Sequence, residues 1–330
     1  MHRDIRLEFR RRPSALAFMA RVVRTSPGVR RGSVPAIGAR WRHSVDPGEL
    51  ARFLALSGLP GEQTLPLLYP HTIGFPLHMA ILTQPAFPLP IWRMLQVRNR
   101  ILQHRPLAQD ATLDIAVEVA GHRVLDKGAE FDLRTSVRDG SGLAWESVNT
   151  FYARGRYGAP TVDAAVPAAP KLVSVEANAT ETRAGTSARV AGVTPEPKVS
   201  AGETASWRLP LRGGWQYGGL SGDFNPLHLW NGYAKKLGYA RAFLHPQRVL
   251  GHCLARLPQA DGEGAVGLDT WLKGPVFYGA EVTLRHAQDD GGAVFALHVE
   301  GDVRPAIVGR LSCQPATTGH DLRKEEPCRN

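Results

Sequence analysis

Residues 218–230 read GGLSGDFNPLHLW and bring a carboxylate (Asp223), an amide (Asn225) and an imidazole (His228) within six positions. Pro226 lies between the amide and the histidine. Because proline lacks an N–H and disfavours a helical conformation in the residue before it, we predict that this segment is a loop. Such a loop can point Asp223 and His228 at one water molecule and activate it by general acid–base chemistry. The residue types alone favour two interpretations equally: this acid–base pair, and an Asx turn followed by a histidine that caps a helix.

Two parts of the chain repeat the same order of predicted elements. Each part begins with helical segments and continues with segments in which apolar and polar residues alternate, as in strands of an antiparallel sheet. Asp46 and Pro47 are typical of a helix start. Helices are predicted within 46–58, 231–239 and 245–257, an apolar segment covers 75–82, and strands are predicted at 95–102, 111–125, 129–139, 143–155, 266–276, 280–290, 293–302 and 306–313. We therefore expect an α+β protein with two copies of one unit, in which a sheet wraps around a central helix.

A stretch rich in Ala, Pro, Val, Thr and Ser separates the two copies and contains no aromatic residue, which is typical of a linker or a long surface crossing. The chain is long enough for two domains of ordinary size. The predicted organisation is a basic N-terminal arm (1–42), a first repeat (43–157), the linker (158–203), a second repeat (204–316) and a C-terminal tail (317–330).

The net charge of +10 is concentrated in the N-terminal arm, which has eleven arginines and two acidic residues, whereas the rest of the chain has 29 basic and 28 acidic residues. This distribution argues against nucleic-acid binding. We expect a solvated, partly helical leader; contact with an acidic carrier protein and a mitochondrial transit segment are the alternatives. No apolar run approaches the roughly 20 residues of a membrane span. The three cysteines show no spacing typical of disulfides or zinc sites. A cytoplasmic location is expected, with the mitochondrial matrix as the alternative.

The run YGGLSGDFNPLH (217–228) resembles the hydratase motif of the MaoC-like family, which comprises (R)-specific enoyl-thioester hydratases and 3-hydroxyacyl-thioester dehydratases. The resemblance extends to LGYARAFLH (237–245), while LYPHTIGFPLHMAIL (68–82) and VRNRI (97–101) resemble the leading repeat of the double-hotdog members. It implies a double hotdog, that is, two antiparallel sheets, each wrapped around a central helix, packed as a pseudo-dimer. Such a chain is expected to be a monomer or to form a homodimer.

The resemblance implies that Asp223 and His228 are catalytic and activate one water molecule. The water adds to C3 of a trans-2-enoyl thioester, or leaves from an (R)-3-hydroxyacyl thioester. Coenzyme A or acyl carrier protein would carry the acyl group, and no cofactor or metal is expected. Because only the second repeat has the motif, we expect the first repeat to bind the acyl chain. The expected substrate-binding residues are Tyr217, Ser221, Gly222, Asn225, His245, Pro246 and Gln247.

Pro246 departs from the family pattern, in which a glycine usually follows the histidine and its N–H faces the thioester oxygen. Proline has no N–H, although it suits the first turn of a helix. The N–H of Gln247 is also free at a helix start, and we expect it to replace the missing donor. Two other functions stay open: an acyl-thioester-binding protein with little turnover, which Pro246 favours, and a hotdog thioesterase, which would release a thiol.

Overall fold

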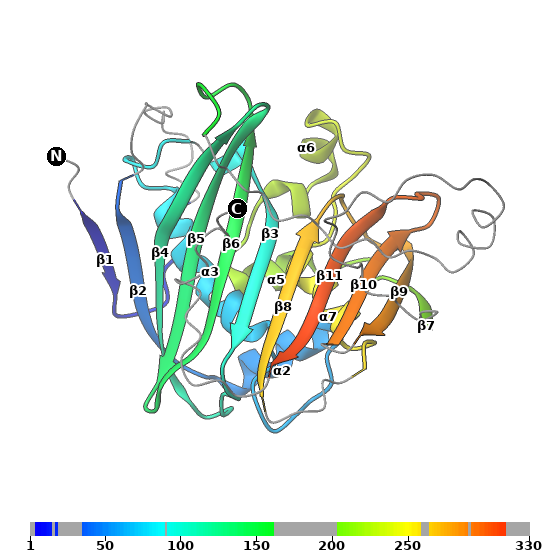
Figure 1. Cartoon of the computed structure of the whole chain (residues 1–330), viewed down its shortest axis with the longest axis horizontal. Helices are drawn as coiled ribbons and strands as arrows, with labels where there is room; N and C mark the ends of the chain where they lie inside the picture. Colours follow the sequence, from blue (N-terminus) through cyan, green and yellow to red (C-terminus); the bar gives the residue numbers. More distant parts are fainter. Residues whose placement is uncertain are drawn as a thin grey trace, which may run out of the picture.

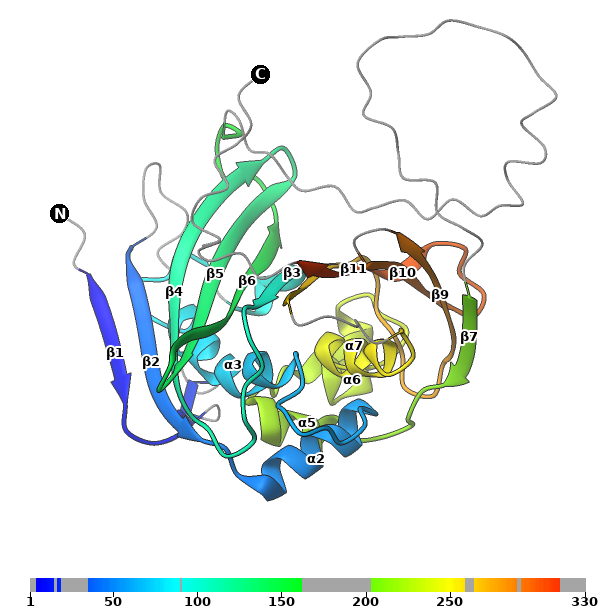
Figure 2. The same ribbon diagram turned by 60° about the horizontal axis from the view of Figure 1, so that its bottom comes forward.

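One curved sheet wraps around the helices of the molecule (Figures 1 and 2). The structure is a computed structural model, and it describes residues 4–14, 17–18, 35–89, 91–161, 203–258, 264–289 and 292–314. Its strands are β1 (Ile5–Phe9), β2 (Ile37–Ser44), β3 (Met94–Gln103), β4 (Thr112–Leu125), β5 (Gly128–Asp139), β6 (Gly142–Arg154), β7 (Glu203–Arg208), β8 (Ala265–Leu272), β9 (Glu281–Asp289), β10 (Gly292–Val299) and β11 (Pro305–Gln314). Its helices are α2 (Pro47–Ser57), α3 (Tyr69–Leu82), α5 (Gly214–Ser221), α6 (Asn231–Lys236) and α7 (Pro246–Leu254), with short 3-10 turns η1 (Ile91–Arg93) and η2 (Pro226–His228). Among the described helices, none has the length and apolar content that crossing a membrane requires.

The order of the strands shows the internal repeat. Across the sheet, the described strands follow the order β1-β2-β4-β5-β6-β3-β8-β11-β10-β9-β7. The first repeat contributes the run β2-β4-β5-β6-β3. Read from the opposite edge of the sheet, the second repeat contributes the run β7-β9-β10-β11-β8, in which the strands follow one another in the same relative order. The two runs meet where β3 pairs antiparallel with β8, from Arg98 opposite Trp271 to Gln103 opposite Val266. The two predicted copies are confirmed, and their sheets are joined edge to edge in one continuous sheet.

The helices lie on the concave side of this sheet, with α3 at the centre of the first repeat and α7 at the centre of the second (Figure 2). Every residue of α3 is buried, and the buried residues include the polar side chains of His71, Thr72 and His78. In α7 the residues from Gln247 to Cys253 are buried. Helix α2 packs against α7, and α3 packs against α5, so the helices of the two repeats share one core.

Local sequence signals account for the start and end of α2. The Asp46 carboxylate accepts a hydrogen bond of 2.6 Å from the Glu49 amide, and Pro47 is the first helical residue. A cap of this kind stabilises a helix by about 1 kcal/mol. Gly58 ends the helix with a φ of 66°, a left-handed conformation that glycine adopts without strain.

The first residues of the N-terminal arm are not solvated as the sequence predicts, whereas residues 17–18 are helical and residues 19–34 lie outside the described residues. Residues Ile5–Phe9 form β1, which pairs in parallel with Ile37–Trp41 of β2. The three apolar side chains of β1 alternate with polar ones and pack against the core, so this part of the arm extends the sheet. Strand β2 also crosses the predicted boundary between residues 42 and 43. Most of the linker and the whole C-terminal tail lie outside the described residues.

Candidate active site

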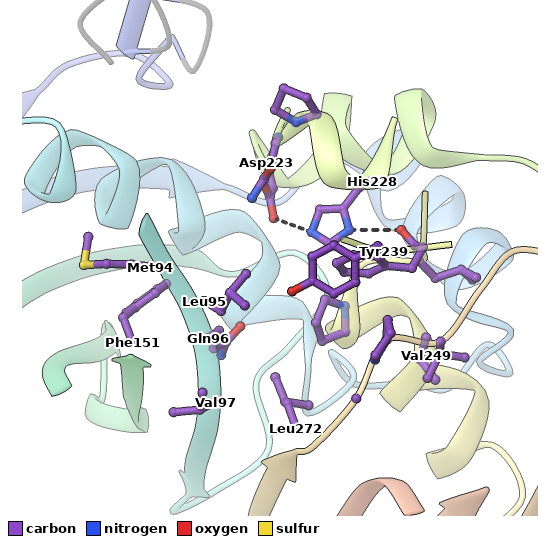
Figure 3. Close-up of a pocket in the computed structure, with 18 of the residues that line it drawn as sticks. Met94, Leu95, Gln96, Val97, Phe151, Asp223, His228, Tyr239, Val249 and Leu272 are labelled. Carbon is purple, nitrogen blue, oxygen red and sulfur yellow. Dashed lines mark hydrogen bonds and ion pairs between the residues drawn. The ribbon is translucent and has the colours of Figure 1, made fainter. Parts of the chain in front are cut away.

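A cavity of about 590 Å³ is lined by both repeats and contains the acid and the histidine of the sequence motif (Figure 3). The first repeat contributes a largely apolar wall that includes Phe75, Met79, Met94, Leu95, Val97 and Phe151. The second repeat contributes most of the polar groups, which include Asp223, Asn225, His228, Tyr233, Tyr239 and Lys273. A cavity of this size with a few convergent polar groups is typical of a small-molecule binding site.

Helix α5 packs closely against the segment that carries the motif. It includes residues 218–221, so the predicted loop begins four residues later than the sequence indicates. A Cβ at Gly218 would lie 3.0 Å from the Asp223 carbonyl oxygen, and a Cβ at Gly214 would lie 2.7 Å from the His228 carbonyl oxygen. These glycines therefore allow the backbone of both motif residues to approach the helix. Gly222 ends α5 with a φ of 74° and starts the loop.

A series of hydrogen bonds fixes the loop of residues 222–225, which we call the Asp223 loop. The Ser221 hydroxyl donates to the Tyr217 carbonyl oxygen (2.9 Å) and accepts from the Asp223 amide (3.1 Å). The Asn225 amide donates to Oδ1 of Asp223 at 3.1 Å, and Oδ1 of Asn225 accepts from the amide two residues further on at 3.1 Å. The predicted Asx turn is therefore present, and it orients the Asp223 carboxylate with Oδ2 toward His228.

The His228 ring has one partner on each side. Its Nδ1 lies 3.0 Å from the Phe243 carbonyl oxygen. Because a carbonyl oxygen only accepts, we assign the proton of the neutral ring to Nδ1, which leaves a lone pair on Nε2. Nε2 lies 3.7 Å from Oδ2 of Asp223 (dashed in Figure 3). A water molecule that lies beside both atoms can donate one hydrogen to each.

His245 lies behind the Asp223 loop. Its Nε2 donates to the Asp223 carbonyl oxygen at 2.9 Å, and its ring centroid lies 4.1 Å from that of His228 and 4.9 Å from that of Tyr217. Burial, reinforced by the nearby His228, lowers the pKa of His245 well below its ordinary value. The ring is therefore neutral, and Nε2 keeps the proton that it donates to the Asp223 backbone.

Tyr217 connects the Asp223 loop to the first repeat. Its side chain is 2% exposed, and its hydroxyl group lies 3.2 Å from Oγ1 of Thr72 in α3. Oγ1 of Thr72 also donates to the Leu68 carbonyl oxygen at 3.1 Å, which leaves the Tyr217 hydroxyl as the donor in the shared bond. The second repeat therefore depends on the first for the position of Tyr217.

The predicted site residues divide into two groups. Four of them line the cavity, namely Asp223, Asn225, His228 and Pro246. The other five are not part of its wall: Tyr217, Ser221, Gly222, His245 and Gln247. Of these five, the first four support the Asp223 loop through the contacts described above.

Gln247 does not take the place that the sequence suggests. Pro246 is the first residue of α7 and forms part of the cavity wall, whereas Gln247 is 5% exposed and is not among the lining residues. Successive side chains of a helix point about 100° apart, so the Gln247 side chain turns away from the cavity. The backbone N–H of Gln247, the donor that the sequence suggests, belongs to a residue outside the cavity wall. Both polar atoms of the Gln247 side chain are buried without a hydrogen-bond partner in the described part of the chain.

Asp223, His228 and His245 are also close enough to be considered as metal ligands. Each can offer one ligand atom, and these atoms lie within 4.8 Å of one another. However, Nε2 of His245 is occupied by its hydrogen bond to the Asp223 carbonyl oxygen. The Nδ1 atom of His245 is buried without a hydrogen-bond partner among the described residues, so one ring nitrogen of His245 stays unengaged.

Sequence reasoning did not identify four polar residues of the cavity wall, Gln96, Tyr233, Tyr239 and Lys273. Tyr239 lies within the run 237–245 that carries part of the family resemblance, but no feature of that run distinguishes a cavity residue from a packing residue. Lys273 follows a strand, where a lysine is usually only a solvated charge. These residues become site candidates only because the fold gathers them around His228.

The comparisons with known proteins agree with this architecture. No family model matches the sequence. The chain is 27% identical over 249 residues to 3-hydroxyacyl-thioester dehydratase X of Mycobacterium tuberculosis. The alignment covers 75% of this chain and 79% of the relative. The crystal structure of that protein, HtdX, aligns with a TM-score of 0.63 at 22% identity and covers 84% of this chain and 100% of its own.

Two further crystal structures share the fold. A MaoC-like dehydratase from Phytophthora capsici aligns with a TM-score of 0.64 at 18% identity, over 86% of this chain and 96% of its own. A protein of Mycobacterium tuberculosis described as a double hotdog aligns with a TM-score of 0.52 at 16% identity, over 87% of this chain and 98% of its own. The resemblance and the fold class predicted from the sequence are confirmed. The chain has the double-hotdog fold of these structures, and its sequence is similar to that of a 3-hydroxyacyl-thioester dehydratase.

Proposed function

We propose that this protein catalyses the reversible hydration of trans-2-enoyl thioesters, and thus the dehydration of (R)-3-hydroxyacyl thioesters. The observation that carries the proposal is the position of Asp223 and His228, whose acceptor atoms Oδ2 and Nε2 face each other at 3.7 Å at the wall of a largely apolar cavity. The sequence relationship to a 3-hydroxyacyl-thioester dehydratase supports the same reaction class.

In the hydration direction, a water molecule bound between Asp223 and His228 is oriented by donating one hydrogen to each. Its oxygen attacks C3 of the enoyl thioester while one of the two residues accepts its proton. The residue that accepted this proton then delivers it to C2, and the negative charge that develops on the thioester oxygen in the transition state needs a hydrogen-bond donor. Dehydration runs through the same steps in reverse.

The shape of the cavity supports an acyl thioester as the substrate. The apolar side chains of the first repeat form a wall that suits an acyl chain, and burial of each methylene contributes about 0.8 kcal/mol. The exposed Lys273 at the cavity offers a positive charge to the phosphate groups of coenzyme A or of the phosphopantetheine of an acyl carrier protein. We propose that one of these carries the acyl group.

The direct test is the hydration of crotonyl- and octenoyl-coenzyme A, followed by the loss of enoyl-thioester absorbance. Wild type should turn over at least one of them, and Asp223→Asn should lower kcat by about 10²–10⁴-fold, the usual contribution of a positioned acid or base. Asp110→Asn removes an exposed carboxylate away from the cavity and is the matched control. Chelators should leave the rate unchanged. A wild type that is inactive with coenzyme A and acyl-carrier-protein thioesters would disprove the proposal, and release of free thiol would indicate a thioesterase.

A binding protein with little turnover is a second candidate, and Pro246 is the observation that favours it. Pro246 forms part of the cavity wall and offers no N–H, while Gln247 is not on the wall. If this candidate is correct, wild type binds enoyl thioesters without hydrating them, and Pro246→Gly gains activity. Calorimetric binding measured beside the hydration assay separates the two candidates.

A further inference from the structure

The cavity wall has no backbone donor where the first turn of α7 reaches it. Addition of water to C3 places negative charge on the thioester oxygen, and a hydrogen-bond donor at that oxygen lowers the barrier. Pro246 supplies no N–H, and Gln247 is not among the lining residues. If the protein is a hydratase, as we propose above, another donor in the cavity has to serve this oxygen.

Tyr239 is held at the cavity by the way in which α6 ends. The Gly238 amide donates to the Lys235 carbonyl oxygen (3.0 Å), and the Tyr239 amide donates to the Ala234 carbonyl oxygen (3.0 Å). Gly238 has a φ of 88°. This pair of bonds around a left-handed glycine is a Schellman motif, which closes the helix and directs the next residue back across it. The position of the Tyr239 backbone is therefore fixed by local structure.

The Tyr239 side chain packs next to the residue that holds His228. Its ring centroid lies 5.1 Å from that of Phe243, and Phe243 lies 5.0 Å from the His228 ring while its carbonyl oxygen accepts the Nδ1 proton of His228. Figure 3 shows the Tyr239 hydroxyl group pointing into the cavity, toward the side that carries Leu95 and Gln96. Tyr239 and His228 are thus placed on the same wall through one shared neighbour.

The Tyr239 hydroxyl group is free to bind a ligand. It has no hydrogen-bond partner among the described residues, although its ring is partly buried in the cavity wall. Burial raises the pKa of Tyr239 above its ordinary value, so the phenol stays protonated at neutral pH and can donate. Because the Tyr239 hydroxyl group makes no hydrogen bond to another described residue, it can donate to a substrate oxygen without first losing a hydrogen bond within the protein.

We propose that the Tyr239 hydroxyl group donates a hydrogen bond to the thioester oxygen of the substrate. It thereby replaces the backbone N–H that a residue other than proline would supply at position 246. No proton is transferred: the phenol stabilises the charge on the oxygen while Asp223 and His228 move the protons. Asn225 and Tyr233 are the competing donors. The bond that ties Asn225 to the turn engages only its Oδ1 and leaves Nδ2 available, and Tyr233 also comes from α6 and lines the cavity.

The test compares phenol deletions in an enzyme whose wild-type turnover has first been measured. Tyr239→Phe should lower kcat by about 10²–10³-fold, the usual loss for one donor to an oxyanion, with a much smaller change in KM. Tyr157→Phe, which removes a partly buried phenol remote from the cavity whose hydroxyl donates to the Arg154 carbonyl oxygen, is the control for fold and handling. Retention of kcat within about threefold of wild type in Tyr239→Phe, or a larger loss in Tyr233→Phe, would overturn the proposal.

A rescue experiment separates donation from a structural effect. In the double variant Tyr239→Phe, Pro246→Gly, a backbone N–H is restored at the start of α7, and kcat should recover at least about tenfold over Tyr239→Phe alone. A purely structural role of the phenol predicts no recovery, and that result would overturn the proposal. Failure of wild type to hydrate any enoyl thioester is a different result, since it would disprove the proposed function before the variants are compared.

Discussion

The hydroxyl groups of Thr72 and Tyr217 lie 3.2 Å apart in the interior, and they join the central helix of the first repeat to the helix that leads into the Asp223 loop. Tyr217 in turn accepts the Ser221 hydroxyl at its carbonyl oxygen, and Ser221 accepts the Asp223 amide. The catalytic candidates of the second repeat are therefore positioned through a contact with the first.

Replacement of Thr72 by valine tests this connection. Thr72→Val keeps the shape of the side chain but leaves the buried Tyr217 hydroxyl without its partner, which costs about 1–3 kcal/mol in the free energy of unfolding. We expect a several-fold decrease in kcat, measured by enoyl-thioester hydration, because the Asp223 loop loses support. Thr72→Ser keeps the hydroxyl and should retain most of the activity. Equal losses in both variants would show that side-chain volume matters and the hydrogen bond does not.

His245 should affect activity by holding the Asp223 backbone. His245→Phe preserves the stacked ring but removes the N–H that donates to the Asp223 carbonyl oxygen. We expect kcat to fall by about tenfold or more, with a loss of about 1–3 kcal/mol in the free energy of unfolding from the unpaired carbonyl. Steady-state kinetics and urea unfolding give the two values. An unchanged kcat would mean that the Asp223 loop keeps its geometry without His245.

Lys273 should distinguish substrates that carry phosphate groups from those that do not. It is an exposed residue at the cavity, and no acidic side chain pairs with it within the described ranges. Since exposed charge pairs contribute about 0.2–1 kcal/mol, Lys273→Ala should raise KM for a coenzyme A thioester by about two- to fivefold. The matching N-acetylcysteamine thioester lacks phosphates and should show no such change. Lys127→Ala, at the turn after β4, is the control for net charge.

The apolar wall of the first repeat should set the preferred chain length. Figure 3 shows Met94 and Phe151 on the side of the cavity away from Asp223 and His228. Met94→Trp reduces the space there, so kcat/KM for octenoyl-coenzyme A should fall more than about tenfold, given about 0.8 kcal/mol for each displaced methylene. Crotonyl-coenzyme A is short and should be turned over at nearly the wild-type rate. Equal losses with both substrates would place the acyl chain elsewhere.

Buried histidines should destabilise the fold in acid. Burial lowers the pKa of His71 to about 3, whereas an unfolded histidine titrates near 6.5. Between these values the unfolded chain binds more protons than the folded one, so stability is lost as the pH falls below about 6.5, by about 1.4 kcal/mol for each pH unit. Unfolding by urea at about pH 7 and about pH 5 measures the slope. His71→Leu should give a shallower slope, and an identical slope would exclude His71 as the cause.

The sequence predicted the regular elements where the local signals were strong. Asp46 and Pro47 marked the start of α2, and alternation marked β4 and β5, which the structure confirms. Helix α5 was missed because Gly214, Gly218 and Gly219 lower its intrinsic propensity. Its formation depends on tertiary packing against the Asp223 loop, which is not visible in a sequence window.

The candidate site was predicted only in part, because local sequence patterns indicate some of its residues and tertiary contacts position the others. Asp223, Asn225 and His228 are adjacent in sequence, so their spacing was enough to bring them together. The Thr72–Tyr217 bond joins residues that are 145 positions apart, and no local pattern indicates it. The expected role of Gln247 depended on where its backbone N–H lies relative to the cavity at the start of α7, and sequence spacing does not define that position.

The division of the cavity between the two repeats has an evolutionary consequence. The acid and the histidine that we propose to move protons lie in the second repeat, while much of the apolar wall comes from α3, β3 and β6 of the first. Substitutions that reshape the wall can therefore accumulate in one repeat without displacing the acid and the histidine of the other. A chain built in this way can change the substrates it accepts by drift in one half while selection keeps the chemistry of the other half constant.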